Sequence, residues 1–111
     1  MTSKKKDASV LLSTCPSETA PQLARFLVEN RLVACVNIVP HVSSVYWWEG
    51  KVEVESESLL VAKAASSDVG RVTEELQRMH PYETPAIVAL PITGGYAPYL
   101  EWIQETASLD P

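Results

Sequence analysis

The chemically richest stretch of the chain is MHPYETP at residues 79–85, which brings together imidazole, phenol, carboxylate and hydroxyl groups. Pro81 cannot continue a helix, and each proline of the stretch restricts the residue before it to extended backbone. A segment stiffened in this way holds polar side chains in set directions. Because imidazole and carboxylate groups bind divalent ions, His80 and Glu83 are candidate metal ligands, for copper or zinc. The alternative is that His80 and Thr84 satisfy backbone groups of the turn, while Tyr82 packs with its hydroxyl hydrogen-bonded.

The two cysteines lie in different sequence surroundings. Cys15 ends a short apolar run and precedes Pro16, which predicts an exposed thiol and makes it the third candidate metal ligand. Cys35 lies within the apolar residues 32–36, where a free cysteine packs mostly as a small hydrophobic side chain. There is no CxxC pair, and cytosolic disulfides are rare, so both cysteines are expected to be free thiols.

Charged side chains alternate with valines after the turn at Glu49-Gly50, and alternate residues of a strand share a face. The pattern puts four side chains on one face: Lys51, Glu53, Glu55 and Glu57. The carboxylates form either a solvated face or oxygen ligands for hard cations. Glu57 also shares its face with Lys63, and each of the two needs a partner if it is buried. Glu57 and Lys63, with Tyr82 and Trp48, are therefore candidate residues of a ligand cleft between subunits.

Three consecutive aromatic residues precede the same turn: Tyr46, Trp47 and Trp48. Neighbours on a strand point to opposite faces, so the three side chains cannot all pack against their own sheet. Aromatic residues at a projecting tip are typical anchors of protein interfaces. We predict that all three contribute to an interface between subunits, and an aromatic wall for a ligand is the alternative.

Length and charge bound the class of protein. A chain of 111 residues fits one domain, and a formal net charge of -5 argues against nucleic-acid binding, which needs a basic face. The polar residues 1–7 are typical of a flexible tail, which leaves residues 8–111 for the domain. No apolar run approaches the ~20 residues of a membrane span, and no secretory signal is recognisable. We predict a cytoplasmic protein with no membrane partner and, for want of a nucleophile–base pair, no enzymatic activity.

Hydrophobic periodicity predicts a strand, a helix, two long strands, a helix, a buried strand and a last helix. Pro21 suits the first turn of the first helix, and Thr19 with Gln22 has the spacing of a capping box. Pro40 predicts an edge, a bulge or a bend in the first long strand. The order βαββαβ plus a C-terminal helix predicts an α+β, ferredoxin-like fold with two helices on one sheet face. The expected segments are residues 8–14, 20–30, 33–48, 51–65, 69–79, 86–91 and 98–107.

The two long strands form a hairpin far longer than ordinary strands of about five to six residues. Its arms overshoot a sheet whose other strands are short, and the sheet keeps one face bare. Exposed strand edges and a large bare apolar surface are hazards unless another chain covers them. The residues therefore predict an obligate homo-oligomer whose hairpin arms reach into neighbouring subunits.

Four motifs occur in order along the chain: CVN at residues 35–37, WEGK at 48–51, ESLLVAK at 57–63 and HPYETP at 80–85. Together they resemble the CutA family, the divalent-cation tolerance proteins, and the resemblance extends over residues 10–103. It implies a ferredoxin-like fold assembled as a tight homotrimer, a link to tolerance of copper and other divalent metals, and a likeness to the PII signalling proteins. No enzymatic reaction is established for the family. Ser13, Met79 and Ala86 depart from the Cys, His and Glu that have been discussed as copper ligands in some members.

These observations lead to two hypotheses about function. The first is a trimeric divalent-cation tolerance protein that requires no cofactor and binds or responds to metal ions through His80, Glu83 and Cys15. The second is a PII-like signalling protein or small-molecule sensor with a pocket between subunits.

Overall fold

The computed structural model describes residues 7–107, and the elements follow the predicted order to within a residue or two. The predicted tail at residues 1–7, apart from Asp7, and the predicted end of the domain at residues 108–111 lie outside the described residues. The elements are β1 (Ala8–Cys15), α1 (Ala20–Glu29), β2 (Cys35–Trp48), β3 (Lys51–Ala65), the 3-10 turn η1 (Ser66–Asp68), α2 (Val69–Met79), β4 (Ile87–Pro91) and α3 (Ala97–Thr106).

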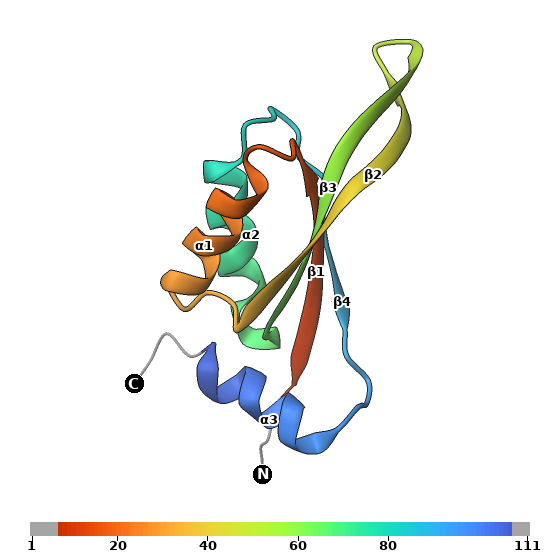
Figure 1. Cartoon of the computed structure of the whole chain (residues 1–111). Helices are drawn as coiled ribbons and strands as arrows, with labels where there is room; N and C mark the ends of the chain where they lie inside the picture. The colour runs from red at the N-terminus through yellow and green to blue at the C-terminus, as the bar shows by residue number, and fades with distance from the viewer. Residues whose placement is uncertain (1–6, 108–111) are drawn as a thin grey trace.

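The four strands form one antiparallel sheet in the order β2-β3-β1-β4. Helices α1 and α2 lie on one face of this sheet, as Figure 1 shows. The main core fills the space between the helices and that face, and its largest members are Leu11, Leu23, Leu27, Leu32, Leu60 and Leu76. The strand order and the one-sided helical layer confirm the predicted ferredoxin-like fold.

Helix α1 begins at the predicted place but without the predicted capping box. Thr19 occupies the N-cap position and makes no side-chain cap hydrogen bond; its hydroxyl donates instead to the carbonyl of Pro16 at 3.0 Å. The backbone of Thr19 is already helical there (φ -95°, ψ -11°), whereas a capping side chain works from extended backbone. Pro21 lies in the first turn as expected.

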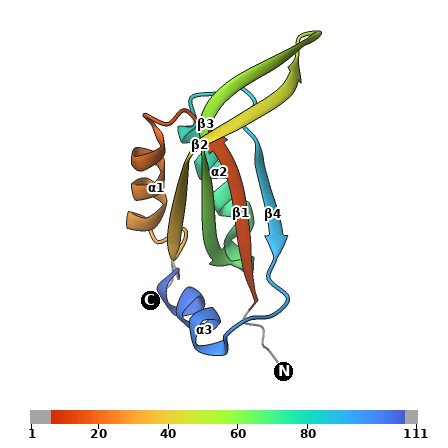
Figure 2. The same cartoon turned by 45° about the vertical axis from the view of Figure 1, so that its right-hand side comes forward.

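Strands β2 and β3 continue past the rest of the sheet as a two-stranded arm, seen at the upper right of Figure 2. A two-residue turn closes the arm, and both of its residues have positive φ, Glu49 at 49° and Gly50 at 79°. Such turns match the twist of the flanking strands. Pro40 and His41 form a bulge, where the pairing register shifts between Val39 and Val42 and the φ of His41 is 61°. Of the predicted possibilities at Pro40, an edge, a bulge or a bend, the structure shows both an edge strand and a bulge.

The sheet face opposite α1 and α2, here called the open face, is apolar. Because side chains alternate along strands, the registers of the four strands place a set of seven apolar residues on it. These residues are Val10, Leu12, Val39, Leu59, Val61, Val88 and Leu90.

The expected burial of the fourth strand is wrong for the single chain. In β4 only Ile87 packs against the core, while Val88 is 55% exposed and Leu90 is 51% exposed. The apolar run was interpreted as a strand covered on both faces. It is instead an edge strand whose second face belongs to the open face.

Helix α3 lies at the end of the sheet away from the arm, as Figures 1 and 2 both show. Its anchor is Ile103, which is fully buried in a small second cluster with Ala8, Ala34 and Ala107. Tyr99 on the same helix contacts the half-buried Cys35, with 3.6 Å between hydroxyl and sulfur. Cys35 pairs with Lys63 in the sheet register and so lies at the open face, which corrects its expected place in the core.

Two neighbours on α1 provide a matched test of this packing. Leu27 is fully buried in the main core, whereas Val28 beside it is 39% exposed. We expect Leu27→Ala to lower the free energy of unfolding by about 2–5 kcal/mol, the range for large-to-small core substitutions. Val28→Ala should cost less than about 1 kcal/mol. Chemical denaturation of both variants measures the difference, and equal losses would contradict the assigned core.

Candidate functional site

After Met79, the last residue of α2, residues 80–86 form a non-helical joint to β4, as the prolines of the MHPYETP stretch predict, and His80 is buried at the start of this joint. The Nδ1 atom of His80 accepts the backbone N–H of Tyr82 at 3.1 Å. Nε2 therefore carries the proton and donates it to the carbonyl of Thr14 at 2.9 Å. Both ring nitrogens are engaged and the residue is 7% exposed, so His80 ties the joint to the end of β1. This arrangement matches the alternative interpretation of His80 as a structural residue rather than a metal ligand.

Tyr82 connects the joint to the base of the arm. Its hydroxyl donates a hydrogen bond to Oε2 of Glu57 at 2.6 Å, and Glu57 is 4% exposed. A buried carboxylate requires a partner of this kind. Burial, followed by the hydrogen bond to Glu57 and the negative charge of that residue, raises the pKa of Tyr82 well above its ordinary value. The phenol therefore stays protonated and serves as a lasting donor to the carboxylate.

Lys63 does not lie beside Glu57 and Tyr82. This corrects the prediction that Lys63 and Glu57 belong to the same cleft. Its ammonium group is only partly buried and donates to the side-chain carbonyl of Asn37, across the β2–β3 pair. Lys63 lies six residues further along β3 than Glu57, toward the end of the sheet that α3 occupies. Lys63 therefore supplies no positive charge to the surroundings of Glu57 and Tyr82.

A cleft of about 740 Å³ lies where the arm leaves the sheet. The arm, from Glu57 at its base to Trp48 beside its turn, forms one wall, and four residues of the joint form the other: Tyr82, Glu83, Thr84 and Ala86. It contains four glutamates, three aromatic side chains and, among the described residues, no lysine, arginine or histidine. The polar and aromatic lining consists of Thr14, Ser44, Tyr46, Trp48, Glu53, Glu55, Glu57, Tyr82, Glu83 and Thr84.

The three consecutive aromatic residues are divided between the two faces of the arm. Tyr46 pairs with Glu53, and Trp48 with Lys51, on the face that lines the cleft. Trp47 pairs with Val52 on the opposite face and is 74% exposed. A hydrogen bond to Glu55 is the main cause that raises the pKa of Tyr46. Of the cleft glutamates, Glu57 is held by a phenol, that of Tyr82 at 2.6 Å.

Cys15 corrects the prediction of an exposed thiol. It is completely buried in the main core, because the helix-facing side of β1 continues through this last residue of the strand. Burial raises the pKa of the Cys15 thiol, which disfavours the thiolate that metals bind. Within residues 7–107, no three His, Cys, Asp or Glu side chains come together as a metal-binding group. The three predicted metal ligands are therefore not assembled into one site, and of them Glu83 alone lines the cleft.

The sequence predicts some of the residues that line this cleft but not all of them. Glu57, Tyr82 and Trp48 were expected together, and the structure brings them to one cavity. Glu53 and Glu55 alternate with valines, which predicts that they share one face, although the same pattern more often marks a solvated strand face than a ligand site. No sequence pattern predicts Thr14 and Thr84 in the cleft, because their positions depend on the sheet register and on the bend of the joint.

Comparisons with known proteins agree with this architecture. The family described as "CutA1 divalent ion tolerance protein" matches residues 9–106. The chain is 45% identical to a mouse protein named Protein CutA over 98 residues, which are 87% of this chain and 55% of that protein. It is 46% identical to the divalent-cation tolerance protein CutA of Thermus thermophilus over 97 residues, which are 86% of this chain and 94% of that one. The chain spans about half the length of the mouse relative.

Solved structures show the same fold. The Thermus thermophilus Cut A1 structure superposes with a TM-score of 0.86 at 45% identity, covering 89% of this chain and 97% of that one. A structure titled "PII-like protein CutA" from Nostoc gives a TM-score of 0.86 at 32% identity, covering 91% and 98%. The fold thus defines a ferredoxin-like α+β protein, whose solved structural neighbours include the PII-like protein of Nostoc. The chain belongs to the CutA1 divalent ion tolerance protein family.

A tyrosine substitution tests the hydrogen bond between the joint and the arm. Tyr82→Phe leaves the buried Glu57 carboxylate without its donor, and we expect a loss of about 1–3 kcal/mol in the free energy of unfolding at neutral pH. Tyr96→Phe, at a residue that is 75% exposed, is the control and should change little.

The raised pKa of Tyr82 adds a pH dependence with a definite sign. The contribution of its protonated phenol is fully present below the ordinary tyrosine pKa of about 10 and is lost as the pH rises toward the folded-state pKa. The stability difference between the parent chain and Tyr82→Phe should therefore shrink in alkali. Denaturation at neutral and alkaline pH measures it, and a constant difference would contradict the assignment.

Proposed function

We propose that the chain assembles as a homotrimer and binds divalent cations in the acidic cleft at the base of its arms. The proposal rests on the lining of the cleft. Among the described residues, this lining contains four glutamates and no lysine, arginine or histidine. A protein of the divalent ion tolerance family would use such a site to bind or sense the ion. The proposed role is binding, without a catalysed reaction.

Two apolar surfaces support the proposed assembly. The first is the open face of the sheet, where Val39, Val88 and Leu90 are each more than two-fifths exposed in the single chain. The second is the arm face that carries Trp47 and Val54. Uncovered apolar surfaces of this kind mark interaction sites. The trimeric stoichiometry is the one that the family resemblance implies.

The cleft would lie between subunits in such an assembly. Along β3, Glu53, Glu55 and Glu57 continue the alternation that places Leu59 and Val61 on the open face. A neighbouring chain seated on that face therefore borders the cleft and can add ligands to it. This position explains how a cation site can form although the described residues of one chain contain no complete metal-binding group.

The donor set fits hard cations better than a copper-specific site. Carboxylate oxygens suit Mg²⁺, Ca²⁺ and Mn²⁺, whereas thiolate and thioether sulfur select Cu(I). The sulfur of Cys15 is in the core and the nitrogens of His80 are both engaged. The residues present therefore do not fit the predicted Cys–His copper site, and they fit a carboxylate site with Glu53, Glu55 and Glu83 as accessible donors.

A second candidate function rests on the size and the aromatic wall of the same cleft. A volume of about 740 Å³ exceeds what a metal ion needs and falls in the range of small-molecule pockets. Tyr46, Trp48 and Tyr82 stand beside the carboxylates, a combination that attracts organic cations through both charge and the aromatic faces. A sensor of a small organic cation is therefore the second proposal.

Light scattering tests the assembly. At micromolar concentration the parent chain should have three times the mass of one chain. Val54→Asp places a charge on the apolar arm face, at a residue already 66% exposed, and should give folded monomers. Val28→Asp makes the same change on the outer helical layer and should remain trimeric. A folded monomer of the parent chain would overturn the assembly.

Calorimetric titration with Mn²⁺ and Cu²⁺ tests the cation site. The double variant Glu53→Gln, Glu55→Gln removes two of the four carboxylates that line the cleft, and we expect it to weaken binding by about tenfold or more, since affinity follows ligand charge. Glu74→Gln, an exposed glutamate of α2 outside the cleft, is the charge control. Cys15→Ser should leave the affinity unchanged. Loss of binding in Cys15→Ser but not in the double variant would refute the carboxylate site.

The same variants separate the two proposals. If the trimer binds neither metal but binds a diamine probe, and the Glu53, Glu55 double variant abolishes that binding, the second candidate is supported. If no cation of either kind binds the assembled trimer, both proposals fail.

A further inference from the structure

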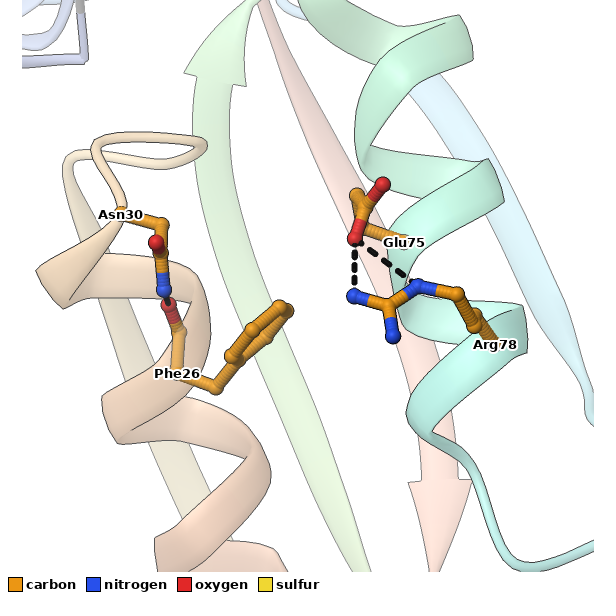
Figure 3. Close-up of polar contacts among 4 residues, drawn as sticks. All are labelled: Phe26, Asn30, Glu75 and Arg78. Atoms are coloured by element: carbon orange, nitrogen blue, oxygen red, sulfur yellow. Dashed lines mark hydrogen bonds and ion pairs between the residues drawn. The ribbon is translucent and has the colours of Figure 1, made fainter.

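A second hollow lies on the outer side of the helical layer, between α1 and α2, far from the acidic cleft in the fold. Its volume is about 290 Å³, and its lining consists of Phe26, Asn30, Leu32, Arg71, Glu75 and Arg78. Figure 3 shows the side chains of Phe26 and Asn30 from α1 and those of Glu75 and Arg78 from α2 around this space. We call it the α1–α2 groove.

Arg78 is held in position in the groove. Its Nε and Nη2 atoms donate to Oε1 of Glu75 at 3.2 and 2.6 Å, as the dashed lines in Figure 3 mark. The guanidinium carbon lies 5.9 Å from the centre of the Phe26 ring, within the range of a cation–π contact. Nη1 has no protein acceptor among the described residues. Arg78 therefore presents a free, pre-oriented N–H edge and remains 61% exposed.

Arg71 supplies a second cation on the same stripe of α2. Residues 71, 75 and 78 follow the i, i+4, i+7 spacing of one helix face. Arg71 is exposed and makes no ion pair or side-chain hydrogen bond within residues 7–107. The lining thus carries two positive charges against the single negative charge of Glu75. This local excess of positive charge occurs on a chain whose formal net charge is -5.

The opposite wall of the groove is rigid because of the way α1 ends. Asn30 caps the helix, and its side-chain amide donates to the carbonyl of Phe26 at 2.8 Å. Arg31 has a φ of 58°, and the backbone N–H of Leu32 reaches back to the carbonyl of Leu27 at 3.0 Å. This is the pattern of a Schellman motif with arginine in the usual glycine position. The wall therefore offers a fixed apolar surface, Phe26 and Leu32, beside the two guanidinium groups.

We propose that the α1–α2 groove binds a small polyanion carrying phosphate or carboxylate groups, with Arg71 and Arg78 as its two binding residues. Two guanidinium groups starting about 10 Å apart along a helix suit a ligand with at least two anionic groups. Guanidinium matches the geometry of both phosphate and carboxylate. Glu75 orients Arg78 and at the same time lowers the affinity for anions.

The groove stays accessible in the proposed trimer. It lies on the helical layer, whereas the surfaces proposed to meet other subunits are the open face and the arm. Anion binding there is thus independent of the cation site, and the two can be tested on the same protein.

The probes are pyrophosphate and citrate, titrated into the full chain by calorimetry, with backbone amide chemical shifts to locate the site. We expect saturable binding of at least one probe, with the largest shifts at residues 26–32 and 71–78. Arg71→Gln and Arg78→Gln should each weaken binding by about tenfold, the scale of one charge-assisted hydrogen bond. Glu75→Gln should strengthen it, because it removes the competing carboxylate.

Arg25→Gln is the matched control. Arg25 is also a helical arginine paired with a glutamate, Glu29, but it lies outside the groove and should change the affinity less than about twofold. A response to pyrophosphate alone assigns the site to phosphates, and a response to citrate alone assigns it to carboxylates. Equal losses in Arg25→Gln and Arg78→Gln, or no saturable binding of either probe, would overturn the proposal. Thermal melts of each variant establish that a loss of binding is not a loss of fold.

Discussion

A sheet that carries helices on only one face has to bury its other face against something else, because exposed apolar surface drives association. In this chain α1 and α2 cover one face, and the open face keeps a continuous set of valines and leucines. The arm also exposes apolar side chains to solvent beyond the sheet, among them Trp47 and Val54. The proposed assembly, the proposed position of the cleft between subunits and the accessibility of the α1–α2 groove in that assembly all rest on this asymmetry.

The hydrogen bond between Tyr82 and Glu57 links the two parts that form the cleft. Glu57 lies where β3 leaves the core for the arm, and Tyr82 belongs to the joint that follows α2. His80 secures the same joint to β1 through Thr14. His80 and Tyr82 of the MHPYETP stretch therefore stabilise the fold through their hydrogen bonds to Thr14 and Glu57. By holding the joint against the arm, they position the other carboxylates of the cleft indirectly.

The charge of the molecule is divided between its two sides. The cleft beside the open face gathers glutamates, whereas the groove on the helical layer presents two arginines. A negative net charge argues against a nucleic-acid partner, but it hides such local differences in charge. Membrane insertion is a separate question, and no helix among residues 7–107 is long and apolar enough to span a bilayer.

Local signals predicted the elements well because each has a local cause. The periodicity of α1, the turn at Glu49-Gly50 and the bulge at Pro40 depend on residues close in sequence. The family resemblance added the trimeric stoichiometry, which is part of the proposed function. Burial was harder to predict, since an apolar run such as β4 reads the same in the centre of a sheet and at its edge. The expected cap at Thr19 failed for a similar reason, because a tight turn at Pro16 already uses its hydroxyl.

By itself, the sequence determined the order of elements, the hairpin arm, the one-sided sheet and the inventory of polar groups available for chemistry. Only the tertiary structure decided which of those groups meet. Cys15 looked exposed beside Pro16 but points into the core, because alternation along β1 aims it toward the helices. Lys63 and Glu57 share a face yet lie too far apart along β3 to share a cleft. Contacts across strands and between helices depend on register and packing, which neighbouring residues in the sequence do not specify.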